Sequence, residues 1–305
     1  MSNSRRKRGR PVHGILVLDK PAGMSSNAAL QEVKRAFSAQ KAGHTGSLDP
    51  LATGVLPVCL GEATKISQFL LDSDKGYRAK LKFGVETDSG DSDGEIIARH
   101  DVAGLAQSQV EKMLARFEGE IQQLPPMHSA LKHKGTPLYK LARKGEVVER
   151  EPRTVTIHDI RLNWLDGDEG EIEVRCSKGT YIRTIATDLG QMLGCGAHIT
   201  GLRRLQAGVF TETESVTLDR LKALRDEEGL QALDDLLVPM DRAIEELPKV
   251  VMPSITAHCV KHGQSVTVRH LPEQGLVRMY ENEHFIGIGF IDDDGMVAPK
   301  RLVLS

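Results

Sequence analysis

Apolar and polar positions repeat with two different periods along the chain, so the sequence predicts strands and helices in mixed order. The continuous apolar run at residues 15–18 predicts a short buried strand, and residues 56–60 predict another. Between these runs, Leu30, Val33 and Phe37 would share one face of a helix over about residues 27–37.

Residues 77–85 show the clearest period of two, which predicts a strand with one apolar and one basic face. Further along, residues 172–176 predict a strand and residues 182–193 a helix, with Gly179 in the connection. Ser108 and Glu111 form a capping-box pattern, which predicts that a helix begins at Ser108. The apolar positions of the 77–85 strand are Tyr77, Ala79, Leu81, Phe83 and Val85.

These elements do not follow a regular βαβ order, which favours an α+β fold with a largely antiparallel mixed sheet. The pattern changes near residues 247–253, where two prolines interrupt the chain. Beyond that point, short apolar runs separated by Gly, Asp and Asn predict a small β-barrel. We therefore expect a large domain over residues 11–246 and a second domain over residues 250–305.

Composition and charge narrow the class of protein. With 305 residues and 40% hydrophobic content, the chain can bury a substantial core. No run of 18 apolar residues is present, and the basic start of the chain lacks the apolar segment of a secretory signal. We therefore expect a cytoplasmic protein with no membrane partner. The sequence contains no coiled-coil repeat, so we expect a monomer.

Basic residues are concentrated at the start of the chain. Residues 1–10 contain five of them and no acid, which predicts a flexible basic tail. The whole chain has a formal net charge of -2, so the residues after this basic start have a more negative net charge than the chain as a whole. A nucleic-acid partner would then require cations gathered on one face, because phosphate attraction is screened over about 10 Å in salt.

Residues 43–54 form a glycine-rich loop around a single acid, Asp49. Gly43, Gly46 and Gly54 permit backbone angles or close approaches that other residues resist, and Pro50 keeps Asp49 out of helical geometry. The loop would therefore hold one carboxylate in a fixed place. From the residues alone, an ordinary helix cap or turn built from Asp and Pro is the favoured explanation of the pattern.

Five sequence blocks follow one another along the chain. They are LDKPAGMSS at residues 18–26, GHTGSLDPLATG at 43–54, KGYR at 75–78, PPMHSALK at 125–132 and SKGTYIR at 177–183. In this order the blocks resemble those of the TruB-type tRNA pseudouridine synthases of bacteria. The resemblance spans nearly the whole chain, and it departs from the commonest family sequence at Ser47, where alanine is frequent.

The resemblance implies a pseudouridine synthase core, a tRNA-contacting clamp inserted at about residues 125–153, and a C-terminal PUA-like RNA-binding domain. It implies that the chain isomerises uridine 55 in the T loop of tRNA, with no guide RNA, metal or organic cofactor. The reaction detaches a flipped-out uracil and rejoins it through C5, so we expect a closed pocket that retains the free base.

Asp49 matches the single catalytic acid of the family, which implies a nucleophile. Arg183 matches the arginine that pairs with this carboxylate, although a surface cation at a helix start would give the same local pattern. Tyr77 matches the tyrosine that stacks on the target base, whereas the strand pattern alone favours an ordinary core tyrosine.

Three further residues receive substrate-binding roles from the resemblance. His44 would pack under the T loop, although the sequence alone indicates a loop histidine bonded to backbone. Lys20, before Pro21, would support the pocket, and Tyr181 lies in the block that contains Arg183. Ser89, Asp91, Asp93 and Gly94 resemble part of a calcium loop, but His100 replaces the required glutamate, so we reject a metal site there.

Two other functions remain open at this stage. A guide-dependent pseudouridine synthase would need partner proteins, and a tRNA chaperone would depend on binding more than on catalysis. A glycosidase is disfavoured, because such enzymes use two carboxylates and we find one acid in a candidate site loop.

Overall fold

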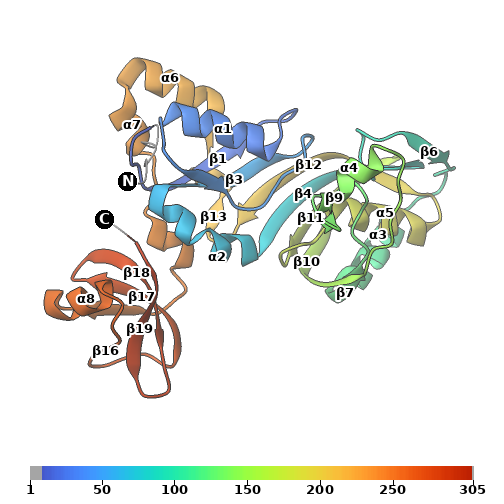
Figure 1. Ribbon diagram of the computed structural model, residues 1–305. Coiled ribbons are helices and arrows are strands. Elements are labelled where there is room, and N and C mark those ends of the chain that lie inside the picture. The colour runs from blue at the N-terminus through green and yellow to red at the C-terminus, as the bar shows by residue number, and fades with distance from the viewer. Residues whose placement is uncertain (1–8, 304–305) are drawn as a thin grey trace.

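A computed structural model describes residues 9–303 of the chain. The basic tail predicted at residues 1–10 therefore lies outside the described residues except for its last two positions. Arg10 is held in place, since its guanidinium pairs with the Asp234 carboxylate and its Nε donates to the Phe37 carbonyl at 2.8 Å. Figure 1 shows a long twisted sheet with helices on it and a smaller C-terminal sheet below one end.

Over residues 9–303 the main sheet contains ten strands, and most neighbours are antiparallel. The exceptions are two parallel pairs, β1 with β14 and β12 with β3. This arrangement confirms the α+β class and the largely antiparallel mixed sheet. The strands in spatial order are β14 (Val216–Thr217), β1 (Gly14–Lys20), β3 (Thr53–Leu60), β12 (Ala197–Ala207), β4 (Lys75–Phe83), β11 (Glu169–Cys176), β10 (Arg153–Asp166) and β7 (Gly119–Gln123), with β2 (Ala42–His44) beside β3 and β13 (Phe210–Thr211) beside β12.

Strand β4 carries the predicted alternation, because Ala79, Leu81 and Phe83 are almost completely buried. The prediction that this strand continues to Val85 was wrong. Gly84 has a φ of +82°, a left-handed conformation that breaks the extended chain, and its N–H donates to the Gly196 carbonyl. Val85 instead begins β5 (Val85–Thr87), which forms a separate hairpin with β6 (Ile96–Arg99).

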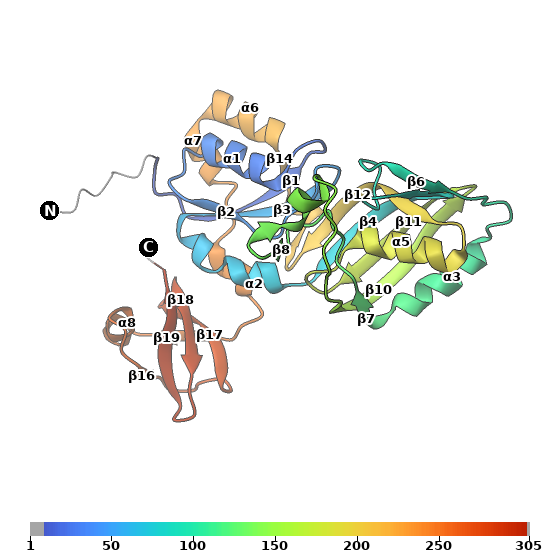
Figure 2. The ribbon, with the colours of Figure 1, turned by 45° about the vertical axis from the view of Figure 1, so that its right-hand side comes forward.

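Helices cover the two halves of the sheet separately, as seen in Figure 2. Helix α1 (Ser26–Ala36) and α6 (Leu218–Glu228) pack near β1 and β3, and their apolar faces meet in one core cluster. Helix α3 (Gln107–Leu114) and α5 (Ile182–Leu193) pack against the other half and share a second cluster. The remaining short helices are η1 (Gly61–Lys65), α2 (Ser67–Asp72), η2 (Ala115–Phe117), η3 (Glu212–Glu214), α7 (Leu230–Asp234) and η4 (Met240–Ile244).

Helix α3 begins earlier than the capping-box pattern predicts. Its N-cap is Ala106, whose N–H donates to Oε1 of Gln109 at 3.0 Å, so Gln109 and not Glu111 reaches back to the cap. Ser108 lies inside the first turn. Because alanine has no side-chain acceptor, only half of the reciprocal capping box is formed.

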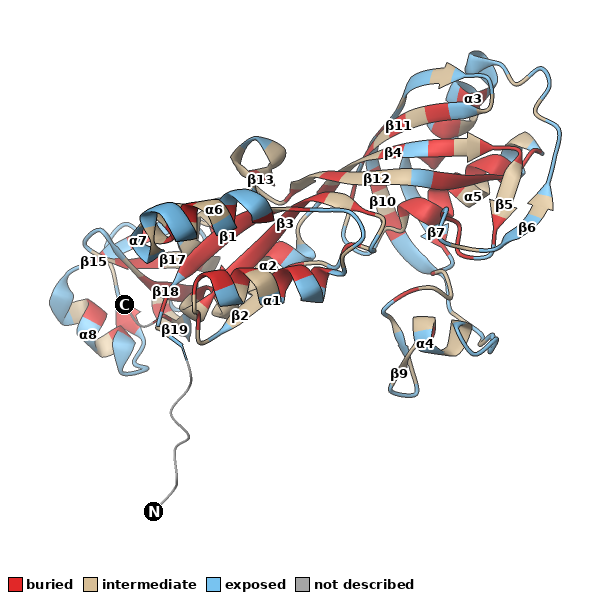
Figure 3. Cartoon of the chain, turned by 90° about the horizontal axis from the view of Figure 1, so that it is seen from above, coloured by how far each residue is buried: buried red, intermediate tan, exposed pale blue. Residues whose placement is uncertain are grey.

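The segment between β7 and β10 leaves the sheet and returns to it. It contains β8 (Lys132–His133), β9 (Thr136–Pro137) and α4 (Leu138–Ala142), and Figure 3 shows α4 and β9 projecting away from the rest of the molecule. The predicted insertion at about residues 125–153 falls on this segment. Its two ends continue β7 and β10, which pair with each other at the edge of the main sheet.

The C-terminal residues form a curled half-barrel of five strands within the described part of the chain. Lys65 Nζ of the large domain donates to the Leu302 carbonyl at 2.9 Å, and Ile288 packs into a core cluster that includes Ile15 of the large domain. The small sheet is therefore docked on the large domain through apolar and polar contacts. Its elements are β15 (Lys249–Met252), α8 (Ser254–Lys261), β16 (Val266–Thr267), β17 (Gly275–Glu281), β18 (His284–Ile291) and β19 (Met296–Leu302).

Among residues 9–303, no helix has the length and apolar character needed to span a bilayer.

Candidate active site

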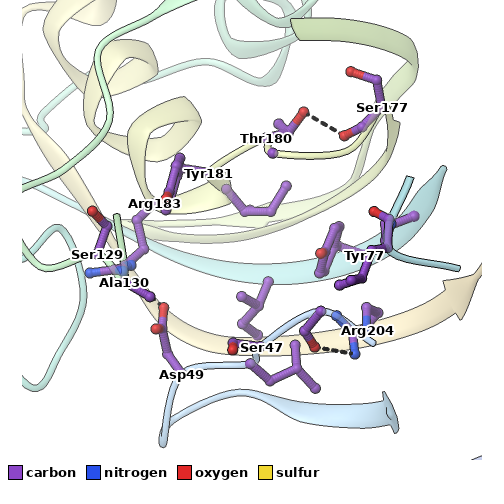
Figure 4. A pocket seen from close by; sticks show the side chains of 17 residues that line it. Ser47, Asp49, Tyr77, Ser129, Ala130, Ser177, Thr180, Tyr181, Arg183 and Arg204 are labelled. Atoms are coloured by element: carbon purple, nitrogen blue, oxygen red, sulfur yellow. Dashed lines mark hydrogen bonds and ion pairs between the residues drawn. The ribbon is translucent and has the colours of Figure 1, made fainter. Parts of the chain in front are cut away.

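A pocket of about 340 Å³ lies where the glycine-rich loop faces β4 and the start of α5. Figure 4 shows Asp49 and Arg183 pointing toward each other at one side of this pocket. Tyr77 and Tyr181 also line it, so four of the six predicted site residues come together here. The other two, His44 and Lys20, do not line the pocket.

The loop that carries Asp49 is fixed at several points. The N–H of Leu48, beside Asp49, donates to Oγ of the buried Ser26 at 2.7 Å, and the Pro50 carbonyl accepts from the Gly23 N–H at 2.8 Å. Gly54 has a φ of +99°, and a Cβ placed on it would lie 2.2 Å from the Arg204 carbonyl. Glycine is therefore required at this end of the loop by both conformation and space.

Asp49 forms an ion pair with Arg183. The distance from Oδ2 of Asp49 to Nη2 of Arg183 is 2.9 Å. The Arg183 side chain is 5% exposed, whereas the Asp49 side chain is 44% exposed. The carboxylate thus faces an opening of the pocket, in contrast to the closed pocket expected from the chemistry.

Arg183 is held by a network that the sequence did not reveal. Nη1 donates to the Ser89 carbonyl at 3.0 Å and lies 3.3 Å from Oδ2 of Asp91, and Nη2 donates to the His128 carbonyl at 2.7 Å. The guanidinium therefore bridges two carboxylates. The residues around Asp91 had suggested only an incomplete calcium loop, so its partner could not be identified from spacing.

The pocket alters the acidity of Asp49. Burial raises the pKa of this carboxyl above its ordinary value, because the charged form loses solvent. The Arg183 guanidinium acts in the opposite direction, the Asp91 carboxylate raises the pKa further, and Lys20 lowers it. The ion pair with Arg183 therefore opposes the effect of burial and favours the ionised carboxylate.

The two tyrosines present their rings to the pocket from different elements. Tyr77 lies on β4, and burial raises the pKa of its phenol, while a hydrogen bond and the positive charge of Arg204 lower it. Tyr181 precedes α5, and its N–H donates to Oε1 of Gln123 at 2.9 Å. Burial also raises the pKa of Tyr181, so both phenols stay neutral in the physiological range.

His44 and Lys20 lie on β2 and β1, outside the lining of the pocket. His44 pairs with Val58 in the sheet, and burial lowers the pKa of its imidazole, which favours the neutral form. Lys20 is fully buried, and its Nζ donates to the carbonyls of Pro21 at 2.7 Å and Met24 at 2.6 Å. Burial lowers the pKa of Lys20 to about 8.

Two further cations line the pocket and were missed by sequence reasoning. Lys75 donates to the carbonyls of Leu70 at 3.1 Å, Leu71 at 2.8 Å and Ser73. Arg204 is 1% exposed and lies on β12. In the sequence these residues look like ordinary strand cations, and only the pairing of β4 with β12 places them beside the site.

No group of three or more His, Cys, Asp or Glu side chains in the described part of the chain is arranged to hold a metal ion.

Comparisons with known proteins identify the family of the chain. Residues 34–182 match the model of the TruB family pseudouridylate synthase N-terminal domain. Residues 183–245 match the tRNA pseudouridylate synthase B C-terminal domain, and residues 248–303 match the C-terminal model of pseudouridine synthase II TruB. The protein named tRNA pseudouridine synthase B of Stutzerimonas stutzeri (strain A1501) is 54% identical over 297 residues, or 97% of each chain.

This chain belongs to the TruB family of pseudouridylate synthases. It is accordingly an isomerase. A second TruB relative, the tRNA pseudouridine synthase B of Vibrio parahaemolyticus serotype O3:K6 (strain RIMD 2210633), is 53% identical and covers 99% of this chain and 98% of its own. The TruB fold also matches a chain in the crystal structure of a Cbf5–Nop10–Gar1 complex, with a TM-score of 0.70, 28% identity, and coverage of 95% of this chain and 84% of that one.

Proposed function

We propose that the protein converts uridine 55 in the T loop of tRNA to pseudouridine, and that it acts on tRNA alone, without guide RNA, partner protein, metal or organic cofactor. The observation that carries this proposal is the 2.9 Å pair of Asp49 and Arg183 in a pocket lined by two tyrosines. Family membership and the printed names of the two relatives support tRNA as the substrate.

Asp49 would be the nucleophile. Its carboxylate is the acid that faces the pocket opening, and Arg183 keeps it oriented with one carboxylate oxygen 2.9 Å from a guanidinium nitrogen. The first step needs no partner base, because an ionised carboxylate can attack without giving up a proton.

The rest of the pocket would receive the flipped base. Tyr77 offers a flat ring for stacking, and Tyr181 closes the pocket near the start of α5. Since the pocket is open on the side of Asp49, the bound RNA itself would complete the wall that keeps the detached uracil from diffusing away. His44 would then lie beneath the T loop, and Lys20 would hold the neighbouring turn.

Two other segments would bind the rest of the RNA. The projecting segment at about residues 125–153 would act as a clamp on the stem-loop, and it carries cations at Lys132, Lys134 and Lys140. Its contact with the site is direct, because the His128 carbonyl accepts a hydrogen bond from Arg183 at 2.7 Å. The C-terminal half-barrel, residues 250–305, would be a PUA-like RNA-binding domain.

The test uses purified protein and an unmodified tRNA transcript, with nothing else added. Nuclease digestion and mass mapping should locate one new pseudouridine in the T loop. A requirement for added partner proteins or guide RNA would favour the guide-dependent alternative. Binding and refolding of tRNA without conversion would favour the chaperone alternative.

A further inference from the structure

Arg204 is a buried guanidinium whose protein partners are all neutral. Its Nε donates to the Val55 carbonyl at 2.6 Å, and Nη2 donates to the Gly46 carbonyl at 3.1 Å. Among residues 9–303, no carboxylate forms an ion pair with it, although the residue is only 1% exposed and lines the pocket. Its charge is therefore not neutralised by the protein.

The contrast with Arg183 is informative. Arg183 also lines the pocket, but its guanidinium lies between the carboxylates of Asp49 and Asp91 at 2.9 and 3.3 Å. In Figure 4, Arg204 and Tyr77 lie on the side of the pocket away from the Asp49–Arg183 pair. The pocket thus has one neutralised arginine beside the nucleophile and one arginine with its charge intact at the other side.

Lys75 adds to this charge. It is 5% exposed, lines the same pocket, and donates to three main-chain carbonyls at the end of α2. The field of Arg204 reaches this ammonium, since burial and then Arg204 lower the pKa of Lys75 to about 8. We refer to Arg204 and Lys75 together as the cationic wall.

Burial of a cation without an anionic partner is costly, because carbonyl dipoles replace hydration only in part. Such a group is most useful where negative charge develops during a reaction, since a preorganised charge then stabilises the transition state without rearrangement. In a pseudouridine synthase, that charge develops on the uracil ring.

The electron balance of the reaction shows that the group facing the cationic wall would be an anionic uracil ring. When the C1′–N1 bond breaks, its electron pair remains on the ring and spreads to O2 and O4. When the C1′–C5 bond forms, the ring supplies the pair, C5 then loses its proton and N1 gains one, so the product is a neutral isomer. Attack of Asp49 on C6 would also place negative charge on the ring, so the requirement does not depend on the route.

We propose that the cationic wall stabilises the anionic uracil ring while it is detached from the ribose. This inference rests on the proposed function and adds a role for Arg204, electrostatic stabilisation of the reacting base, that is separate from the role of Arg183. Arg204 also fixes the pocket, because it bonds the glycine-rich loop and the Tyr77 phenol. The experiment must therefore distinguish the effect of the Arg204 charge from the effect of the hydrogen bonds by which Arg204 holds the pocket in shape.

The first test compares Arg204→Gln with Arg204→Lys in single-turnover reactions on T stem-loop RNA that carries uridine or 5-fluorouridine at the target position. Fluorine withdraws electrons and stabilises the ring anion, so it should substitute for part of the stabilisation that the Arg204 guanidinium provides. Because 5-fluorouridine has no proton at C5, its C5-linked product keeps the fluorine and adds water at C6, and mass mapping follows formation of that product. We expect Arg204→Gln to slow rearrangement of uridine by about 100-fold, with a clearly smaller loss for 5-fluorouridine. Arg204→Lys, which keeps a charge, should retain more activity on uridine.

The matched control is Arg203→Gln, because Arg203 is the adjacent arginine of β12 and is paired with Asp19 and Glu212. Its ratio of rates on the two bases should equal that of the unaltered protein. Equal losses in Arg204→Gln and Arg204→Lys, or the same loss on both bases, would assign Arg204 a purely supporting role and overturn the proposal. Absence of T-loop pseudouridine with the unaltered protein would instead reject the proposed function.

A second test uses the unaltered protein and so does not depend on whether the variants fold. T stem-loop RNA with 6-azauridine at the target position is bound, and the ionisation of the base is followed by ultraviolet absorbance. The cationic wall should lower the pKa of the base in the complex relative to free RNA. An unchanged or raised pKa would contradict the proposal.

Discussion

Asp91 lies 3.3 Å from Nη1 of Arg183, and its side chain is only 7% exposed. The carboxylate is itself fixed, since Oδ1 accepts from Oγ of Ser89 at 2.5 Å and from the Asp93 N–H at 3.1 Å. Asp91 therefore holds Arg183 through the nitrogen that Asp49 does not use. Asp91 thus helps to position the arginine that pairs with the proposed nucleophile, Asp49.

Asp91→Asn should reduce catalysis much more than binding. The amide keeps the shape of the side chain but removes the charge that orients Arg183, and a misplacement of about 1 Å at a reacting group can cost about 100-fold in rate. We expect a loss of that order in single-turnover rate, with tRNA affinity nearly unchanged. Asp93→Asn, at an exposed neighbouring position, should retain full activity, and equal losses in the two variants would contradict this account.

The acid limb of the pH–rate profile should report Asp49. Burial raises the pKa of this carboxyl, and only the ionised form can attack, so the rate should fall with decreasing pH at a higher pH than for a solvent-exposed aspartate. The Asp91 charge raises the same pKa, so Asp91→Asn should move the limb to lower pH. A limb that moves to higher pH in this variant would contradict the assignment.

Gly54→Ala should destabilise the fold strongly. The new Cβ would lie 2.2 Å from the Arg204 carbonyl, in addition to the cost of a left-handed residue. Gly104→Ala is the matched control, since Gly104 also has a positive φ, +86°, but has open space around its Cβ position. In urea unfolding, we expect a loss of about 1 kcal/mol for the control and at least twice that for Gly54→Ala.

Lys20 should make stability depend on pH in the alkaline range. Its pKa is about 8 in the folded protein and 10.5 as the ordinary value, so between these pH values the unfolded chain binds a proton that the folded protein does not. Stability should therefore rise by about 3 kcal/mol from this residue as the pH increases through that window. The pKa of Lys75 is also lowered to about 8, so that residue adds a similar rise. Lys20→Met should therefore reduce the rise in stability by the Lys20 contribution, whereas Lys80→Met, at an exposed position on β4, should leave the whole rise unchanged.

Local sequence patterns predicted the helices and strands better than they predicted which strands pair with each other. The helix expected at residues 182–193 is α5, and the strand expected at residues 15–18 is the centre of β1, because each depends on its own apolar face. The same reasoning overextended β4 at Gly84, where a single left-handed residue ends the strand. Nothing local indicates that β12 lies parallel to β3.

In the candidate site, too, the sequence predicted residues that lie in recognisable motifs and missed residues that depend on contacts between distant segments. Asp49 and Arg183 were paired through the resemblance, and the structure places them 2.9 Å apart. Asp91 and Arg204 were missed, because each acts through contacts across long stretches of chain that leave no periodic signal. Lys20 was placed near the pocket, but its bonds to two nearby carbonyls required coordinates.

The central claim is that the Asp49 carboxylate attacks the target nucleotide. The most direct measurement is single-turnover conversion of unmodified tRNA by Asp49→Asn, with the product mapped by mass at the T loop and tRNA affinity measured in parallel. The account predicts tRNA binding close to that of the unaltered protein and no detectable pseudouridine at position 55. Conversion by Asp49→Asn at a rate near that of the unaltered protein would contradict it.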